Sequence, residues 1–92
     1  MARVKVKTLA TLYEATGSFE HVIEVEDGAR IRDVVMKLVE MFPKVKEVLG
    51  DDVFKELMIL HNGRHVEFLP MGIDTPVKDG DTIVLIPPAG GG

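Results

Sequence analysis

The sequence predicts a single α+β domain in which a mixed β-sheet packs on one main helix. Two segments near the start alternate apolar and charged residues, one helical stripe of apolar residues follows, and an apolar run lies near the end. These periods of two and of 3.6 are typical of strands and helices. The expected order is β-β-α-β-β, with the helix crossing between hairpins. A chain of 92 residues holds one core, and no repeat or linker divides it.

The first two strands are expected at residues 3–9 and 19–26. Both segments place apolar side chains on one side and charged ones on the other, as half-buried strands do. Residues 9–16 between them can form one helical turn, which Gly17 ends. The two strands therefore form a hairpin with a wide loop.

The main helix is expected to begin at Ile31 and to end before Pro43. The residue before a proline resists the α conformation, so the proline marks the end of the helix. Arg30 is then the N-cap residue, although its side chain offers no hydrogen-bond acceptor to the first turn. The apolar stripe of the helix consists of Ile31, Val34, Val35, Leu38, Val39 and Phe42.

The second half of the chain is expected to add shorter elements. Residues 44–55 can include a short helical turn, and an apolar strand follows at 57–60. Asn62-Gly63 indicates a tight hairpin turn, because type I′ turns need a positive φ at both central residues. The return strand is placed at 65–69 and a surface connection at 70–77.

The last strand is expected at residues 82–86, which are apolar on both faces and therefore belong in the centre of the sheet. Pro87 and Pro88 follow, and they must end the ladder because proline donates no backbone N–H. Residues 1–88 are accordingly predicted to form the domain. Residues 89–92 are predicted to form a flexible glycine tail, because they have almost no side chains to pack.

Composition narrows the classes of function. The net charge of −4 argues against nucleic-acid binding, which needs an excess of Lys and Arg on one face. The absence of cysteine excludes disulfides, iron–sulfur clusters, thiolate zinc sites and Cys nucleophiles. No segment reaches the roughly 20 apolar residues that span a bilayer, and no signal peptide is recognised at the start. We therefore expect no membrane partner and a cytoplasmic location.

The tail is the segment in which a chemical function can be seen. Glycines let the backbone enter a narrow channel, and a carboxylate at their tip can reach a buried active site. Transfer of the adenylyl group from ATP to this carboxylate would release pyrophosphate and give an acyl adenylate, from which AMP departs readily. A sulfur nucleophile would then yield a thiocarboxylate, and an amine would yield an amide. The chain supplies no base and no metal for these steps, so we expect a substrate of an activating enzyme, with ATP used by that partner and no cofactor bound by the chain.

The end of the sequence resembles the MoaD/ThiS family, which includes the small subunit of molybdopterin synthase and the thiamine sulfur carrier. The most specific segment is 78–92, KDGDTIVLIPPAGGG, which is similar to that family's Gly-Asp, apolar strand, Pro-Pro, Gly-Gly ending. Weaker matches lie at 9–17 and 60–64. The resemblance covers nearly the whole chain, and the Pro-Pro pair is closer to the molybdopterin carrier than to the thiamine one.

The resemblance implies a ubiquitin-like β-grasp fold and adenylation by a ubiquitin-activating-like adenylyltransferase. Gly91 and Gly92 correspond to the terminal pair of the family, so Gly92 would carry the adenylate and then the thiocarboxylate. The sulfur would be delivered to the molybdopterin synthase large subunit. Gly90 and Ile86 depart from the residues common at their positions; the departure at Ile86 can alter partner affinity without changing the chemistry.

The resemblance also assigns the two faces of the sheet. In ubiquitin-like folds Ile83, Leu85 and Ile59 would face the core. Their neighbours along each strand would then form an apolar surface in water, and such surfaces usually mark a partner site. The predicted partner-binding residues are Gly90, Pro88, Pro87, Ile86, Val84 and Leu60, with Met58 as a further candidate.

Two other groups of polar residues have spacings that can indicate a metal site or a pair of carboxylates. His61 and His65 would be a metal pair on a helix, but the Asn-Gly turn between them and the lack of a third ligand argue against a metal site. Asp51-Asp52 and the aspartates at 79 and 81 look like paired carboxylates. Both pairs flank glycine turns, where aspartate is expected for backbone reasons.

Three functions remain open from the sequence. The first is a sulfur carrier for molybdenum or tungsten cofactor synthesis. The second is a small protein modifier of the archaeal kind, whose Gly92 forms an isopeptide with target lysines. The third is a β-grasp interaction module whose tail is inert. The first two need the same fold, tail and activation, so the sequence does not separate them.

Overall fold

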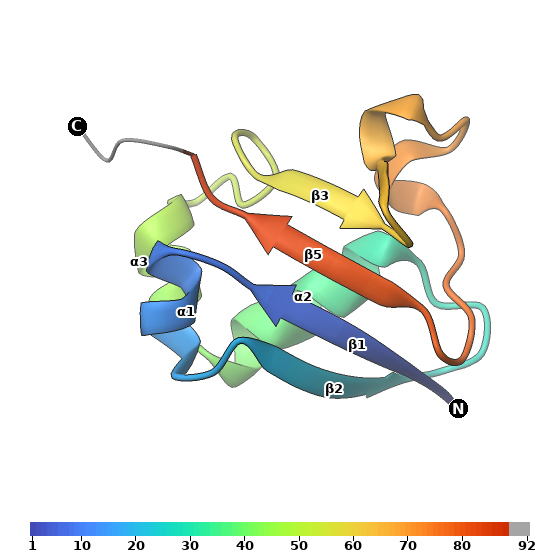
Figure 1. The fold of residues 1–92 in the computed structure, drawn as a ribbon, viewed down its shortest axis with the longest axis horizontal. Coiled ribbons are helices and arrows are strands. Elements are labelled where there is room, and N and C mark those ends of the chain that lie inside the picture. The colour runs from blue at the N-terminus through green and yellow to red at the C-terminus, as the bar shows by residue number, and fades with distance from the viewer. Residues whose placement is uncertain (89–92) are drawn as a thin grey trace.

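The computed structural model describes residues 1–88 (Figure 1). It contains five strands, three helices and two short 3-10 turns. In chain order these are β1 (Ala2–Thr8), α1 (Thr11–Thr16), β2 (Glu20–Val25), α2 (Ile31–Met41), α3 (Lys44–Leu49), β3 (Met58–His61), β4 (Arg64–His65), the 3-10 turns Val66–Phe68 and Gly72–Asp74, and β5 (Thr82–Ile86).

The strands form one mixed sheet in the order β2-β1-β5-β3-β4, and α2 crosses behind it (Figure 1). β5 lies parallel to β1, and every other neighbouring pair is antiparallel. The predicted α+β class and the central place of the last strand are confirmed. The predicted order β-β-α-β-β contains one strand fewer than the described residues, in which three strands follow the helices: the two of the second hairpin, and then β5.

The core lies between α2 and one face of the sheet. Five apolar residues of the predicted helical stripe are buried: Ile31, Val34, Val35, Leu38 and Val39. Across from them, Ile83 and Leu85 of β5 are fully buried and Ile59 of β3 is 1% exposed. Phe42 is the C-cap of α2 and packs at the margin of the core, so the helix ends where Pro43 predicts.

The predicted return strand at 65–69 is wrong. β4 has only two residues, and a 3-10 turn replaces the rest of the strand. The His65 Nδ1 atom accepts a hydrogen bond from the Glu67 backbone N–H at 3.0 Å, which offers the backbone a local partner in place of a ladder. The turn before β4 is as predicted: Asn62 and Gly63 have φ values of 50° and 84°.

Arg30 occupies the N-cap of α2, as predicted, and half of a capping box is present. The Arg30 backbone N–H donates to Asp33 Oδ2 at 2.9 Å. The guanidinium does not cap the helix; its Nη1 donates to the Asp74 carbonyl at 2.7 Å and so ties the helix start to the second 3-10 turn. Replacing the arginine therefore removes a tertiary hydrogen bond as well as a poor cap.

We expect Arg30→Ser to be more stable than Arg30→Ala by about 1 kcal/mol, because only serine can accept a hydrogen bond from the first turn. Both variants lose the bond to Asp74, so their difference isolates the cap. Relative to the wild type, the serine variant should change little, since a lost hydrogen bond of about 1 kcal/mol offsets the gain. Urea denaturation at neutral pH measures all three; equal midpoints for the serine and alanine variants would contradict the cap.

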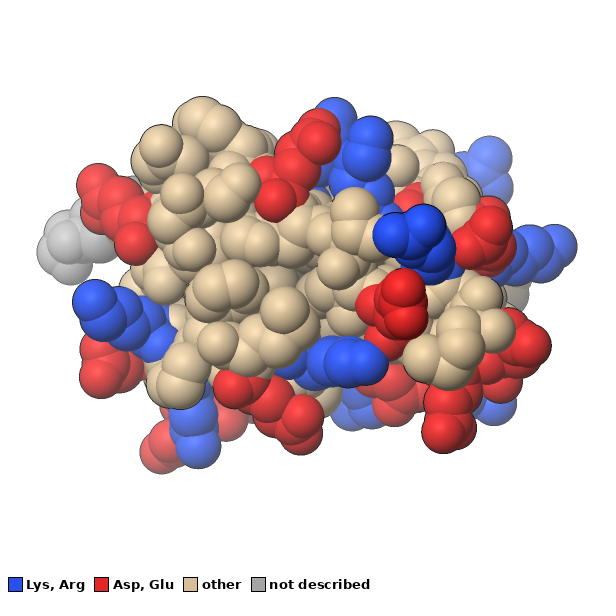
Figure 2. All heavy atoms as spheres, turned by 90° about the horizontal axis from the view of Figure 1, so that it is seen from below, with Lys and Arg blue, Asp and Glu red and all other residues tan. Residues whose placement is uncertain are grey.

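Charged side chains of both signs are interspersed around an uncharged area on the face shown in Figure 2. A surface of this kind supports solubility and offers no extended field of one sign on that face. Within residues 1–88, no helix has the length and apolar character needed to cross a membrane.

Candidate functional site

The root of the tail is held by the centre of the sheet. On the β1 side, the last hydrogen bond of β5 runs from the Leu9 N–H to the Leu85 carbonyl at 3.3 Å. On the β3 side, Ile86 still pairs with Met58. Pro87 is buried and Pro88 is exposed, so the chain leaves the domain between these two prolines. The exit lies at the end of the sheet that carries α1 and α3 (Figure 1).

The predicted tail, residues 89–92, lies outside the described residues. The roles assigned to Gly90, Gly91 and Gly92 therefore stay predictions, as does the flexibility of the segment. Pro87 offers little surface to a partner while it is buried, so its role in partner binding also stays a prediction. What the structure supplies is a fixed starting point for the segment.

The face of the sheet opposite α2 carries the predicted apolar surface. Leu60 pairs with Val84 and Met58 pairs with Ile86 across β3 and β5, so these four residues form two adjacent rows. We call these four residues the open-face patch. Met58 is 44% exposed and the other three are half-buried. The predicted assignment of the two faces is confirmed, because Ile59, Ile83 and Leu85 are buried on the other side.

Three neighbours of the open-face patch were not predicted. Lys7 of β1 lies opposite Val84, and His65 of β4 lies opposite Leu60. Phe68 is 78% exposed, and its ring centroid lies 5.9 Å from that of His65. If the register of the second hairpin had been predicted, the sequence would have placed His65 opposite Leu60. The position of Phe68 depends on the 3-10 turn, for which the sequence carried no signal.

The two histidines of the second hairpin do not form a metal pair. His65 shares the open face with Leu60, whereas His61 is one residue further along β3 and points to the opposite face. The His61 Nε2 atom lies 2.8 Å from Asp81 Oδ2 and both side chains are nearly buried. Among residues 1–88, no group of three or more His, Asp or Glu side chains is arranged to hold a metal ion.

Asp81 connects the β3–β4 turn to the start of β5. Its carboxylate accepts hydrogen bonds from Asn62 Nδ2 at 3.0 Å and from the Lys78 N–H at 2.8 Å, in addition to its contact with His61. Burial raises the pKa of Asp81, but the hydrogen bonds from Asn62, His61 and Lys78 outweigh it and hold the pKa below its usual value. The aspartate is therefore a structural acceptor, in agreement with the backbone role predicted for this turn.

We expect Asp81→Asn to lower the free energy of unfolding at neutral pH by about 1.5–3 kcal/mol, because charge-assisted hydrogen bonds are lost. Asp81 has a lower pKa in the folded chain than in the unfolded chain, where it is about 3.9. The stability from ionised Asp81 is thus present above pH ~4 and is lost as the pH falls through the folded value. Chemical denaturation from pH 7 to pH 2 should show the wild type and the variant converging in acid.

Asp79→Asn is the matched control for that series. Its exposed carboxylate accepts one backbone hydrogen bond, from the Arg3 N–H at 2.8 Å, so it should cost less stability. Equal losses for the two variants would show that Asp81 is not the centre of the network.

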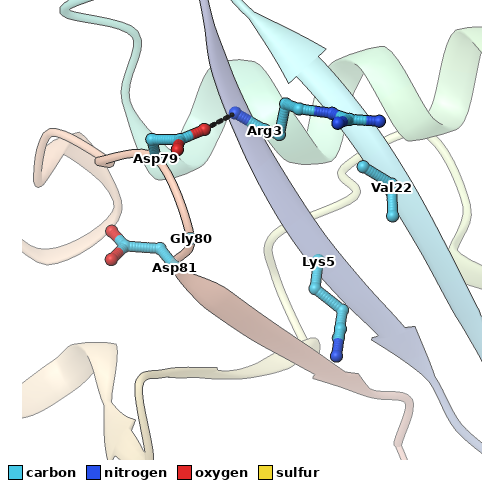
Figure 3. A pocket seen from close by; sticks show the side chains of 6 residues that line it. All are labelled: Arg3, Lys5, Val22, Asp79, Gly80 and Asp81. Atoms are coloured by element: carbon cyan, nitrogen blue, oxygen red, sulfur yellow. Dashed lines mark hydrogen bonds between the residues drawn. The ribbon is translucent and has the colours of Figure 1, made fainter.

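An open depression of about 440 Å³ lies beside this turn on the same face as the open-face patch (Figure 3). In Figure 3 the Asp81 carboxylate points away from Lys5, and Asp79 is engaged with the backbone of β1. Both carboxylates therefore accept hydrogen bonds within the fold: Asp79 from the Arg3 N–H, and Asp81 from Asn62 and the Lys78 N–H. It is lined by Arg3, Lys5, Val22, Asp79, Gly80 and Asp81.

A mixed five-stranded sheet on one main helix, with a central last strand that leads to a proline–glycine end, defines a ubiquitin-like β-grasp protein. The ThiS family matches residues 6–92, and the chain belongs to that family. Two relatives of the chain are a sulfur carrier subunit and a small modifier protein.

The relatives named here are similar to the chain over nearly its full length. The molybdopterin synthase sulfur carrier subunit of Chlamydomonas reinhardtii is 30% identical, over 98% of this chain and 99% of the relative. Small archaeal modifier protein 3 of Haloferax volcanii is 31% identical, over 97% and 98%. The solution structure of small archaeal modifier protein 1 from Methanosarcina acetivorans is 36% identical, with a TM-score of 0.83, and the match covers 100% of this chain and 98% of that one.

Proposed function

We propose that the chain is a sulfur carrier for molybdopterin synthesis, the pathway to the molybdenum or tungsten cofactor, and that it works through the carboxylate of Gly92. The observation that carries the proposal is the continuity of β5 with the glycine segment. The strand is fixed in the centre of the sheet, carries half of the open-face patch, and leads through two prolines into residues that the family match covers up to Gly92.

Two chemical steps load the carrier. The Gly92 carboxylate attacks the α-phosphate of ATP, which releases pyrophosphate and leaves an acyl adenylate. Hydrosulfide, supplied by a donor, then attacks the acyl carbon; the bond from that carbon to the AMP oxygen breaks, AMP departs, a proton is lost to solvent, and the thiocarboxylate remains. ATP and the catalytic groups belong to a ubiquitin-activating-like adenylyltransferase. This chain contributes the acyl group and the surface by which it is held.

Docking places the tail in the partner's active site. The open-face patch supplies apolar area for binding, and the rooted tail spans the distance to the reacting atoms. Four residues beyond Pro88 extend by about 13–14 Å, which sets the depth of the site that they can reach. We propose that the adenylyltransferase and the molybdopterin synthase large subunit use the same patch in turn, so that loading and delivery exclude each other.

A second candidate is supported by the likeness to the small archaeal modifier proteins. In that function an amine replaces the sulfur nucleophile, AMP departs, and Gly92 becomes joined to a target lysine by an isopeptide bond. The same fold, patch and activation serve both outcomes. The third candidate, an interaction module with an inert tail, needs the patch but no activation.

Intact mass spectrometry of the protein purified from its native cell distinguishes the three. If one terminal oxygen is replaced by sulfur, the mass of the chain rises by the difference between the two elements. That increase would support the sulfur-carrier function. A series of larger species that contain the chain joined to other proteins supports the modifier. A single unmodified mass, together with no adenylation by the native activating enzyme, would overturn both in favour of the inert module.

A further inference from the structure

β2 is the longer of the two edge strands of the sheet. The opposite edge, β4, has two residues and is followed by a 3-10 turn, whereas β2 has six residues in extended conformation. An edge strand of this length normally presents a row of unpaired N–H and C=O groups, which can pair with another chain. How the groups on the outer edge of β2 are occupied therefore decides whether copies of the chain can associate there.

The hydrogen bonds of β1 show which residues of β2 point outward. The Arg3 N–H donates to Asp79 Oδ1 and the Lys5 N–H donates to the Asp81 carbonyl, both on the β5 side of β1. The Thr8 N–H donates in the other direction, to the Phe19 carbonyl. Odd-numbered residues of β1 thus turn their backbone groups away from β2, as alternate residues of a ladder must.

The register converts this alternation into positions on β2. Arg3, Lys5 and Lys7 lie opposite Glu24, Val22 and Glu20, respectively. In an antiparallel ladder, two residues that face each other either exchange hydrogen bonds or both point away. Glu20, Val22 and Glu24 therefore direct their N–H and C=O groups to the open edge.

Side chains occupy the two ends of this edge. The Ser18 hydroxyl donates to the Glu20 carbonyl at 3.1 Å and accepts from the Glu20 N–H at 3.4 Å. At the other end, the Lys37 ammonium of α2 donates to the Glu24 carbonyl. Val22 lies between them, and the described part of the chain offers no hydrogen-bond partner to its outward pair.

The charges of β2 work in the same direction. If a second copy added to β2 as an antiparallel strand centred on Val22, Glu20 of each copy would face Glu24 of the other. Like charges directly opposite each other destabilise a strand pair, and here the effect is reduced by Arg3 and Lys7, which lie 3.6 Å from Glu24 and 3.9 Å from Glu20. Val22, 56% exposed, would be the only apolar side chain in the outward-facing row of three residues.

We infer that Ser18 and Lys37 close the β2 edge to strand addition and so prevent copies of this chain from pairing edge to edge. Ser18 occupies both backbone groups at one end, Lys37 occupies the carbonyl at the other, and the two glutamates repel a second copy. The inference concerns association between copies and does not depend on the proposed chemistry of the tail.

The test removes the two capping side chains together. We expect the double variant Ser18→Ala/Lys37→Ala to form dimers at roughly millimolar concentration, because three more outward backbone groups become available for strand pairing. Sedimentation equilibrium should show the mass rising from 10.1 kDa toward twice that value. The double variant Thr11→Ala/Lys46→Ala, which loses the same groups from exposed positions on α1 and α3, should stay monomeric. A monomeric Ser18→Ala/Lys37→Ala variant with an unchanged melting temperature would overturn the inference.

A third substitution locates the contact. Val22→Pro in the uncapped background removes an N–H that makes no bond within the sheet, so the domain can tolerate it while strand pairing cannot. We expect it to restore the monomer. If the dimer persists, the association lies elsewhere and the inference fails. If the proline variant does not fold, hydrogen exchange of the Val22 amide can be measured in the double variant Ser18→Ala/Lys37→Ala. We expect the exchange rate to fall as the protein concentration rises. An exchange rate independent of concentration, in a sample that dimerises, would contradict edge pairing.

Discussion

Deletion of Gly92 is expected to abolish adenylation while leaving the melting temperature unchanged. The deletion shortens the reach of the tail by ~3.5 Å, about one extended residue. Reacting atoms must approach within roughly 3–3.5 Å, so this shortening withdraws the carboxylate from ATP. We expect ATP–pyrophosphate exchange with the cognate adenylyltransferase to fall by about 100-fold or more, since displacements of ~1 Å already have effects of that size.

Two variants separate reach from obstruction. Gly91→Val keeps the length but adds a branched side chain next to the reacting group, and one residue added after Gly92 keeps every glycine but moves the carboxylate. Both should fail in the same exchange assay. Full exchange by the Gly92 deletion would show that Gly91 serves equally well and that position does not matter. No exchange by the wild type would favour the inert module.

Leu60→Asp is expected to weaken binding to the adenylyltransferase by about ten- to a hundred-fold. A leucine buried at an interface contributes about 1.5–3 kcal/mol, which corresponds to a change of that size in Kd. The aspartate adds the cost of burying a charge. Ile86→Asp should act in the same way, because Ile86 belongs to the same open-face patch. Isothermal titration calorimetry against the purified enzyme measures both.

The matched control is Met36→Asp, on the exposed side of α2 and hence on the opposite layer of the molecule. It makes the same kind of change to an exposed apolar residue and should leave Kd within about two-fold of the wild type, a difference of only ~0.4 kcal/mol. Equal losses for the two variants would place the partner elsewhere. Unfolding of the Leu60 or Ile86 variants, followed by circular dichroism, would mean that their apolar contacts within the sheet matter more than their exposure.

The long periodic elements were predictable because their signals are local. Six apolar residues at helical spacing fixed α2 and its face, and an apolar run followed by Pro87 fixed β5. The predicted return strand at 65–69 was wrong, and the reason is also local, although the strand propensity of these residues does not show it. One imidazole nitrogen of His65 accepts the Glu67 N–H, which gives the backbone a local partner where the chain leaves the ladder.

The candidate site divides in the same way. The position of the glycines behind the last strand and two prolines, together with the family resemblance, pointed to the tail. The resemblance also assigned the core face, and alternation along β3 and β5 then placed Leu60, Val84 and Ile86 on the other face. The neighbours across the strands could not be found by alternation, because register joins residues that lie far apart in the chain. Lys7 meets Val84 only because β1 and β5 are parallel, and that pairing leaves no local mark.

The central place of β5 has a consequence for biosynthesis. β5 follows every other described element along the chain, yet it separates β1 and β2 from β3 and β4 in the sheet. A nascent chain that has not yet released β5 from the ribosome holds two hairpins with no strand between them, and a two-stranded hairpin is at best marginally stable in water. The sheet can close only after β5 has emerged, and the glycine segment is attached directly behind it. A copy that lost its end through interrupted synthesis before β5 would therefore lack both the closed sheet and the half of the open-face patch that β5 carries, so it would not present that surface to a partner.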